Sequence, residues 1–184
     1  SIPAIRVLRQ QVAARFPGQA HDVGALRRAT YVELAEACGY PGSLGDEAFA
    51  VFQQARNRVM PYADVRPALR RLARRFPLVA LTNGNADLAA IGLQQHFSAV
   101  LGAAGLGVAK PDPRAFRAVC ERLGLQPADI VHAGDHPQHD VAGARAAGMT
   151  AVWVDRGQHA WPGGLPPARH VVHDLAELAA LVGA

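Results

Sequence analysis

The chain has 184 residues, of which 50% are hydrophobic and 18% charged, enough to bury the core of one domain with a small appendage. No apolar run reaches the roughly 20 residues that cross a bilayer, and no signal peptide opens the sequence. The two cysteines, Cys38 and Cys120, fit small buried hydrophobes in a reducing compartment, so we expect a cytoplasmic protein without membrane contact.

The net charge of +4 raises nucleic acid as a partner. The densest basic stretch, residues 66–75, keeps its apolar positions at helical spacing and has no interleaved aromatic residues for base stacking. These arginines therefore indicate a solvated helix face. We expect no nucleic-acid partner, and we expect the protein to be a monomer or a homodimer.

Residues 1–61 are helical in pattern and contain no convincing strand. Asp22 and Ser43 precede the second and third helical segments and are candidate N-terminal caps. The three predicted helices span residues 2–16, 22–39 and 43–59. The pattern predicts a small helical module.

Residues 62–184 alternate short apolar runs with amphipathic segments. The apolar runs cover residues 76–81, 99–103, 129–135 and 150–155. The predicted helices cover residues 66–75, 87–95, 113–123, 138–147 and 174–182. This alternation predicts an α/β fold with a doubly wound parallel sheet, covered by helices on both faces.

Lys110 is the only lysine in the chain, because the other 18 of the 19 basic residues are arginines. An ordinary surface charge in such a composition would be arginine as well. A single chance lysine on a loop is the simple explanation. The alternative is that Lys110 has a task that a planar guanidinium does not perform.

Polar residues follow three of the predicted strands, where ligands bind in sheets of this kind. Thr82, Asn83 and Gly84 offer a hydroxyl and backbone N–H groups that suit a phosphate oxygen, although such a turn is common. Asp135 and Asp140 suit a hard cation such as Mg²⁺, although each also fits a turn or a cap. The two aspartates together with a lysine are a more specific signal than any one of them.

Three nearby histidines, His132, His136 and His139, raise a zinc hypothesis. His132 lies within a predicted strand and the other two lie in the turn after it, so their spacing matches no strong zinc signature. We expect no zinc site there.

Three motifs together resemble the haloacid dehalogenase-like (HAD) hydrolase superfamily. They are LTNGN at residues 81–85, AKPDPRAF at 109–116 and GDHPQHDVAGARAAGM at 134–149. Residues 1–61 look like the small helical cap of that family, and residues 62–184 like its Rossmann-like core. The combination YADVRPALRRL followed by LTNGN is similar to the phosphatase branch.

The resemblance implies a Mg²⁺-dependent phosphatase that acts on a small phosphomonoester through an aspartyl-phosphate intermediate. In that reading Lys110 is catalytic and neutralises the nucleophile and the phosphoryl oxygens. Asp135 ligates Mg²⁺, with Asp140 supporting the metal or the lysine. The phosphoryl group is held by Thr82, Asn83 and Gly84.

The family pattern begins with a central strand that carries an Asp nucleophile and a second, acid/base Asp, and no such DxDxT stretch occurs in the sequence. We expect this strand within roughly 10 to 20 residues upstream of Ser1, because a missing central strand leaves backbone groups unpaired. By itself, the chain is expected to be inactive.

Two alternatives remain open. A 2-haloacid dehalogenase shares the nucleophile and the lysine, but that branch needs no metal and typically lacks the Gly-Asp of the last motif. A degenerate, non-catalytic relative would lack the acidic pair on the first strand.

The substrate is also open among a sugar phosphate, a nucleotide and flavin mononucleotide. Four residues of the helical module either touch a leaving group or form the core of the module: Tyr40, Phe49, Phe52 and Arg56.

Overall fold

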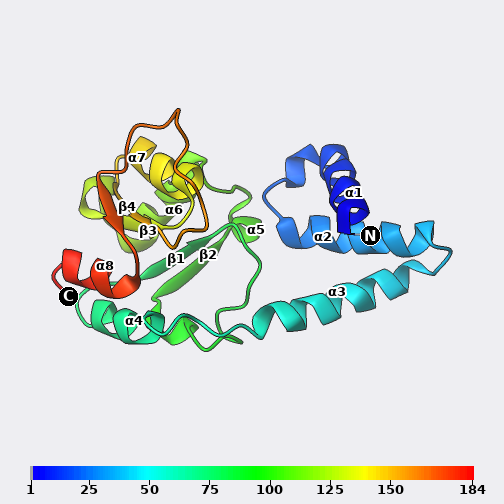
Figure 1. Cartoon of the computed structure of the whole chain (residues 1–184), viewed down its shortest axis with the longest axis horizontal. Coiled ribbons are helices and arrows are strands. Elements are labelled where there is room, and N and C mark those ends of the chain that lie inside the picture. Colours follow the sequence, from blue (N-terminus) through cyan, green and yellow to red (C-terminus); the bar gives the residue numbers. More distant parts are fainter. Residues whose placement is uncertain (1) are drawn as a thin grey trace.

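Three helices form the N-terminal part of the chain in the computed structural model, which describes residues 2–184 (Figure 1). They are α1 (Ile2–Arg15), α2 (Val23–Ala37) and α3 (Gly42–Asn57), with a 3-10 turn at Pro17–Gln19. The Asp22 side chain accepts a hydrogen bond from the Ala25 N–H, as predicted for the cap of α2. The cap predicted at Ser43 is wrong, because α3 begins one residue earlier and Pro41 takes the capping position.

α2 and α3 pack with their backbones in contact. A Cβ atom on Gly45 would lie 2.4 Å from the Cα of Val32, so only a glycine permits this approach. Beside the crossing, the rings of Tyr31, Phe49 and Phe52 lie within 6.1 to 6.5 Å of one another. These contacts hold α2 against α3, and the ion pair of Arg15 with Glu33 joins α1 to α2. The three helices are here called the helical module (α1–α3).

The rest of the chain has the predicted α/β architecture, with parallel strands only. The strands are β1 (Val79–Thr82), β2 (Ala99–Gly102), β3 (Val131–Gly134), β4 (Thr150–Val154) and β5 (His170–Val172). The sequence pattern did not indicate β5, which has only three residues and follows a long Pro- and Gly-rich loop.

Helices cover both faces of the strands, because β4 is apolar on both sides. Ala151 and Trp153 pack toward α6 and α7, and Val152 and Val154 pack toward α4 and α8. None of the helices within residues 2–184 is long and apolar enough to span a bilayer. The helices are α4 (Val65–Ala73), α5 (Ala103–Leu106), α6 (Pro113–Leu123), the π-helix Pro137–Ala142, α7 (Gly143–Ala146) and α8 (Leu175–Leu181).

The α-helix predicted over residues 87–95 is wrong. The Asp87 side chain accepts hydrogen bonds from the N–H groups of Ala89 and Ala90 and folds the chain into turns. Gly92 then adopts φ +72°, which ends any helical path, and only the 3-10 turn Gln94–His96 follows.

The strands form two sheets rather than the single sheet expected. β1 pairs with β2, and β3, β4 and β5 pair in that order, with no strand of the described residues between β1 and β3. A cavity of about 450 Å³ lies between these two edges. Its lining is mostly apolar and comes from both sheets and from α4, α6 and α8, including Leu72, Val79, Leu81, Val119, Ile130, Ala133 and Leu178.

Asp64 ties three segments of the core together. Its Oδ2 accepts hydrogen bonds from Arg156 Nη2 at 2.5 Å and from the Leu175 N–H at 2.9 Å. The side chains of the ion pair are only 16% and 17% exposed. Burial alone would raise the pKa of Asp64, but the hydrogen bonds from Arg156 and Leu175 and the Arg156 charge lower it below its ordinary value.

We expect Asp64→Asn to lower the free energy of unfolding by about 1–3 kcal/mol at pH 7. Because the folded-state pKa is lowered, this contribution is present above the unfolded pKa of about 4 and is lost as the pH falls through the folded value. Urea unfolding of the parent protein and of Asp64→Asn, each at pH 7 and at pH 3, measures the difference in the free energy of unfolding. The control is Asp46→Asn, which breaks the exposed pair with Arg28 and should cost less than about 1 kcal/mol. Equal effects of the two substitutions would contradict the assignment.

Candidate active site

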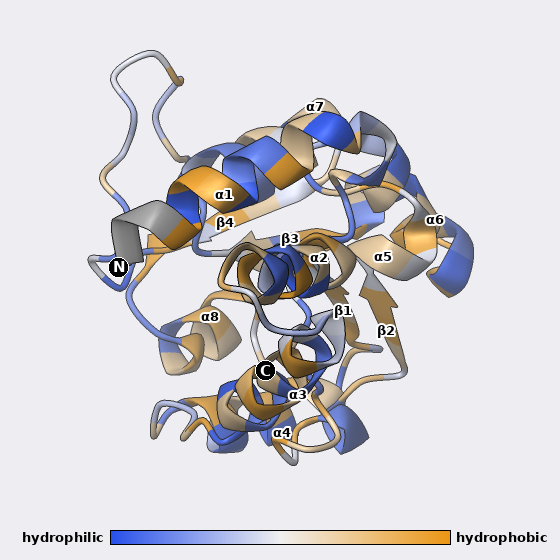
Figure 2. Cartoon of the chain, turned by 90° about the vertical axis from the view of Figure 1, so that its right-hand side faces the viewer, coloured by the Kyte–Doolittle hydropathy of each residue, from blue (hydrophilic) through white to orange (hydrophobic). Residues whose placement is uncertain are grey.

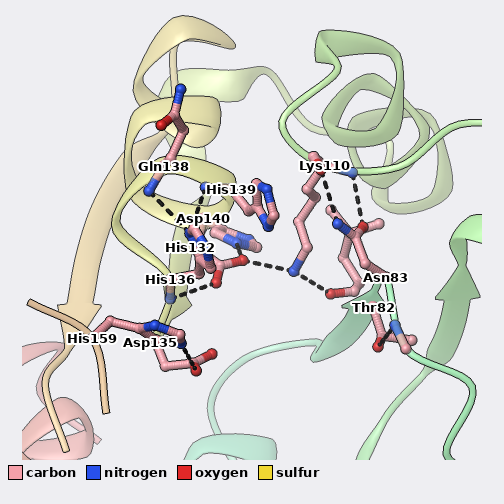
Figure 3. Close-up of polar contacts among 12 residues, drawn as sticks. Thr82, Asn83, Lys110, His132, Asp135, His136, Gln138, His139, Asp140 and His159 are labelled. Carbon is pink, nitrogen blue, oxygen red and sulfur yellow. Dashed lines mark hydrogen bonds and ion pairs between the residues drawn. The ribbon is translucent and has the colours of Figure 1, made fainter. Parts of the chain in front are cut away.

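Lys110 bridges the two sheets at the carboxyl ends of their strands. Its Nζ donates to the Leu81 carbonyl oxygen of β1 and to Asp140 Oδ1, which follows β3, each at 2.7 Å. The Lys110 and Asp140 side chains are 11% and 6% exposed, so the ion pair is buried. An ammonium group has three N–H donors, and the third remains for a ligand (Figure 3).

Asp140 is held by β3 and by the turn that follows it. Its Oδ2 accepts a hydrogen bond from the His136 N–H at 3.0 Å, and its Oδ1 lies 3.2 Å from His132 Nε2. A Cβ atom on Gly134 would lie 2.3 Å from the Asp140 carboxyl carbon, so the glycine makes room for the carboxylate. Burial would raise the pKa of Asp140, but the bonds from His132 and Lys110 and the Lys110 charge hold it well below its usual range.

His132 belongs to this group, although the sequence alone did not assign it a role. Its ring packs edge-on against buried Phe116, with 5.2 Å between the ring centres. Strand alternation is the signal that identifies it, because residues two apart share a face and Gly134 faces Asp140.

Asn83 positions Lys110 through the backbone. Its Nδ2 donates to the Lys110 carbonyl oxygen and its Oδ1 accepts from the Lys110 N–H, both at 2.8 Å. Neighbouring Thr82 accepts the Gly84 N–H on its Oγ1 at 2.9 Å, which leaves the hydroxyl hydrogen for a ligand. Of the three residues predicted to hold a phosphoryl group, Thr82 keeps its hydroxyl donor free, while the Asn83 amide donates to Lys110 and the Gly84 N–H donates to Thr82.

Asp135 presents the open carboxylate of the site. Its side chain is 56% exposed, and its Oδ2 lies 3.4 Å from His159 Nε2. In Figure 3 it lies at a distance from the Lys110–Asp140 pair. In contrast, both oxygens of Asp140 already accept hydrogen bonds. The structure therefore divides the two predicted metal residues into an open carboxylate and one that holds Lys110.

The donor set suits Mg²⁺ better than a transition metal. Within residues 2–184 no group of three or more His, Cys, Asp or Glu side chains is arranged to hold a metal ion. Mg²⁺ is usually bound through one or two carboxylates, with waters and substrate phosphates as the other ligands. The Asp135 carboxylate is one such ligand, so the described residues fit Mg²⁺ as a partial set.

The histidines beside Asp135 pack on one another. The rings of His136 and His139 stack with centres 3.9 Å apart, and His136 Nδ1 accepts the N–H groups of Gln138 and His139. Burial lowers the pKa of His139 from its ordinary value. His136 thus caps the π-helix that carries Asp140.

The helical module meets the site at the loop after β1. Asn85 Nδ2 donates to Gln53 Oε1 at 2.8 Å, which links α3 to this loop. A Cβ atom on Gly84 would lie 3.3 Å from both Arg56 Nη2 and Thr82 Oγ1, so Arg56 stands next to the site. In Figure 2 the module lies in front of the strands, with α2 over the region between β3 and β1.

Comparisons with known proteins identify the class. A family model described as haloacid dehalogenase-like hydrolase matches residues 7–148, and the chain belongs to this family. It is 42% identical over 141 residues to a phosphoserine phosphatase of Thermus thermophilus, covering 73% of the chain and 56% of the relative. It is 34% identical over 154 residues to the Escherichia coli 5-amino-6-(5-phospho-D-ribitylamino)uracil phosphatase YigB, covering 80% and 63%.

Solved structures show the same fold. A 2-haloacid dehalogenase from Pseudomonas syringae pv. Tomato superposes with a TM-score of 0.90 and 34% identity, covering all of this chain and 81% of the other. The chain spans 56% and 63% of the length of the two curated phosphatases.

The two hydrogen bonds between the Asn83 side chain and the Lys110 backbone, here called the Asn83 clamp, give a test of how Lys110 is positioned. We expect Asn83→Ala to lower the free energy of unfolding by about 1–3 kcal/mol, because the Lys110 N–H and carbonyl both lose partners. Urea denaturation measures this loss. The control is Asn57→Ala, which removes a single exposed hydrogen bond to the Asp87 N–H and should cost less than about 1 kcal/mol. A smaller loss for Asn83→Ala than for the control would contradict the clamp.

Proposed function

We propose that the protein is a Mg²⁺-dependent phosphatase that hydrolyses a small phosphomonoester. The observation that carries the proposal is the buried Lys110–Asp140 pair, which holds a cation with one free N–H at the carboxyl ends of the strands. Phosphoryl transfer requires this kind of fixed positive charge, since catalysis consists mainly of positioning and electrostatic stabilisation. The matching phosphatases support the reaction type.

The chain's own residues bind and orient the phosphoryl group. The free N–H of Lys110 donates to one phosphoryl oxygen, and the Thr82 hydroxyl donates to another. Lysine suits this position because a compact ammonium fits between Leu81 and Asp140 and still faces the ligand. Asn83 keeps that geometry fixed through the Lys110 backbone.

The attacking group comes from a strand that fills the gap between β1 and β3. Two parallel strand edges face a largely apolar cavity there, and Lys110 crosses its end. A strand apolar on both faces would pair with both edges. By the family resemblance, an Asp at its carboxyl end attacks phosphorus and forms the aspartyl-phosphate as the P–O bond to the leaving group breaks, and the second, acid/base Asp gives the departing oxygen its proton, so that the alcohol is released. Water then hydrolyses the aspartyl-phosphate.

A bound Mg²⁺ would supply positive charge that stabilises the phosphoryl oxygens. Asp135 is the described residue that would ligate it, because its carboxylate is exposed at the end of β3. Asp140, whose two oxygens already meet Lys110, His132 and the His136 N–H, would support the metal shell only indirectly.

A 2-haloacid dehalogenase is the second candidate, and the match to the Pseudomonas syringae structure favours it. The retained carboxylates Asp135 and Asp140 favour the phosphatase, since dehalogenation of this type needs no metal. Chloride release from 2-chloropropionate that is insensitive to EDTA would reverse the choice. A gap-filling strand without acidic residues would instead support a non-catalytic relative.

The relatives suggest small substrates, because their names specify phosphoserine and a phosphorylated ribitylaminouracil. The proposal includes a cytoplasmic location, which fits two cysteines that form no disulfide. The prediction that both are buried is wrong for Cys38, which is exposed.

Lys110→Arg tests the central charge. In the protein that includes the gap-filling strand, we expect kcat for p-nitrophenyl phosphate to fall at least about 100-fold, because a planar guanidinium does not fit between Leu81 and Asp140. The matched control is the reverse exchange Arg117→Lys on the exposed side of α6, which should leave kcat unchanged. Activity of Lys110→Arg within about threefold of the parent would refute this role.

Asp135→Asn tests the metal ligand. We expect the Mg²⁺ concentration for half-maximal activity to rise at least about tenfold, because an amide oxygen is a weaker ligand than a carboxylate. Asp129→Asn, an exposed aspartate at the opposite end of β3, is the control and should not change it. If the parent's activity withstands EDTA, the metal part of the proposal fails.

A further inference from the structure

Two arginines of the helical module, Arg27 and Arg56, lie within reach of each other's charge and have no anionic partner among the described residues; Arg56 is the one that lies against the loop after β1. Arg56, in the last turn of α3, lies beside Gly84 and Thr82. Arg27, on α2, lies with its guanidinium carbon 4.4 Å from the centre of the Phe52 ring. Phe52 precedes Arg56 by one turn of α3. Among the ion pairs of residues 5–184, none includes Arg27 or Arg56.

Both arginines, and Asn85 in the loop after β1, carry a polar atom without a partner within residues 2–184. Arg27 Nη1, Arg56 Nε and Asn85 Oδ1 are buried and make no hydrogen bond with the described chain. Buried donors without acceptors are costly, and they usually have a partner that completes them. Asp22, the acidic residue at the start of α2, already accepts the Ala25 N–H on its Oδ1.

The positive charges here are concentrated. Burial and then the charges of Arg56 and Arg9 lower the pKa of Arg27 from its ordinary value. Like charges held together without a counter-ion repel one another. An anion placed between Arg27 and Arg56 would relieve this repulsion and supply the missing acceptors.

We propose that Arg27 and Arg56 form a binding site for an anionic group on the substrate's leaving group, and that this group is a carboxylate. The inference rests on the proposed function and deepens it, since it narrows the substrate class to phosphomonoesters that carry a second negative charge. A guanidinium presents its N–H donors in a planar fork that matches the two oxygens of a carboxylate.

The position of the arginines decides which part of the substrate they meet. Lys110 and Thr82 hold the phosphoryl group from the strand side. Arg56 approaches Gly84 from the helical module, so it faces what extends from the phosphoryl group toward α2 and α3. If Arg27 only packed over Phe52, the buried N–H groups of both arginines would be expected to find acceptors within the protein. They do not among the described residues, which favours a ligand as the partner.

The test compares two esters that differ in the carboxylate, 2-phosphoglycolate and ethyl phosphate. The variants are Arg27→Gln and Arg56→Gln, measured in the protein that includes the gap-filling strand. We expect each to lower kcat/KM for 2-phosphoglycolate about 10- to 100-fold and to change the value for ethyl phosphate less than about threefold. The control is Arg28→Gln, the next residue of α2, whose exposed side chain pairs with Asp46. It should affect neither ester.

Each outcome decides the inference. Equal losses on both esters, or no loss on either, would overturn it. If Arg27→Gln does not fold, Arg56→Gln and Arg56→Lys carry the test, because lysine keeps the charge and should restore part of the selectivity. If the unmodified protein hydrolyses neither these two esters nor p-nitrophenyl phosphate, the proposed function is wrong. Calorimetry then measures the affinity of the unmodified protein and of Arg56→Gln for 2-phosphoglycolate, which tests the anion site alone. Equal affinities of the two proteins would overturn the inference.

Discussion

The Lys110 ammonium and the Asp140 carboxylate lie in contact with little access to water, and such a pair is stable only when its neighbours complete its hydrogen bonds. The neighbours do so here. Leu81 accepts from the ammonium, and the His136 N–H and His132 meet the carboxylate. Removal of either charge would leave the other buried and unpaired, so the pair constrains the loops on both sides of it.

The same pair spans the gap between the two sheets. Leu81 belongs to β1 and Asp140 follows β3, so Lys110 links two edges that share no backbone hydrogen bond. The apolar lining of the cavity explains why this region is suited to a strand and not to solvent. A strand placed there would end next to the ammonium, which brings the attacking group and the fixed charge to one point.

The helical module adds selectivity to this arrangement. It contacts the core through the Gln53–Asn85 hydrogen bond and places Arg56 beside Gly84. The strand ends therefore supply the chemistry common to the family, while the module supplies the charges that face the rest of the substrate. A division of this kind allows the substrate to change by substitutions on α2 and α3 that leave Lys110 untouched.

The sequence by itself determined the fold class and four of the five strands, because alternation is a local signal. From strand-end position and residue chemistry it predicted the candidate site residues Thr82, Asn83, Gly84, Lys110, Asp135 and Asp140. It also marked Lys110 as unusual by composition alone. Only the tertiary structure separated the two aspartates, since the engagement of Asp140 depends on a lysine 30 residues away. It likewise showed that Asn83 holds the Lys110 backbone and that His132 contacts Asp140. The position of Arg27 over Phe52 and within reach of the Arg56 charge depends on the packing of α2 against α3, and long-range packing leaves no periodic trace in the chain.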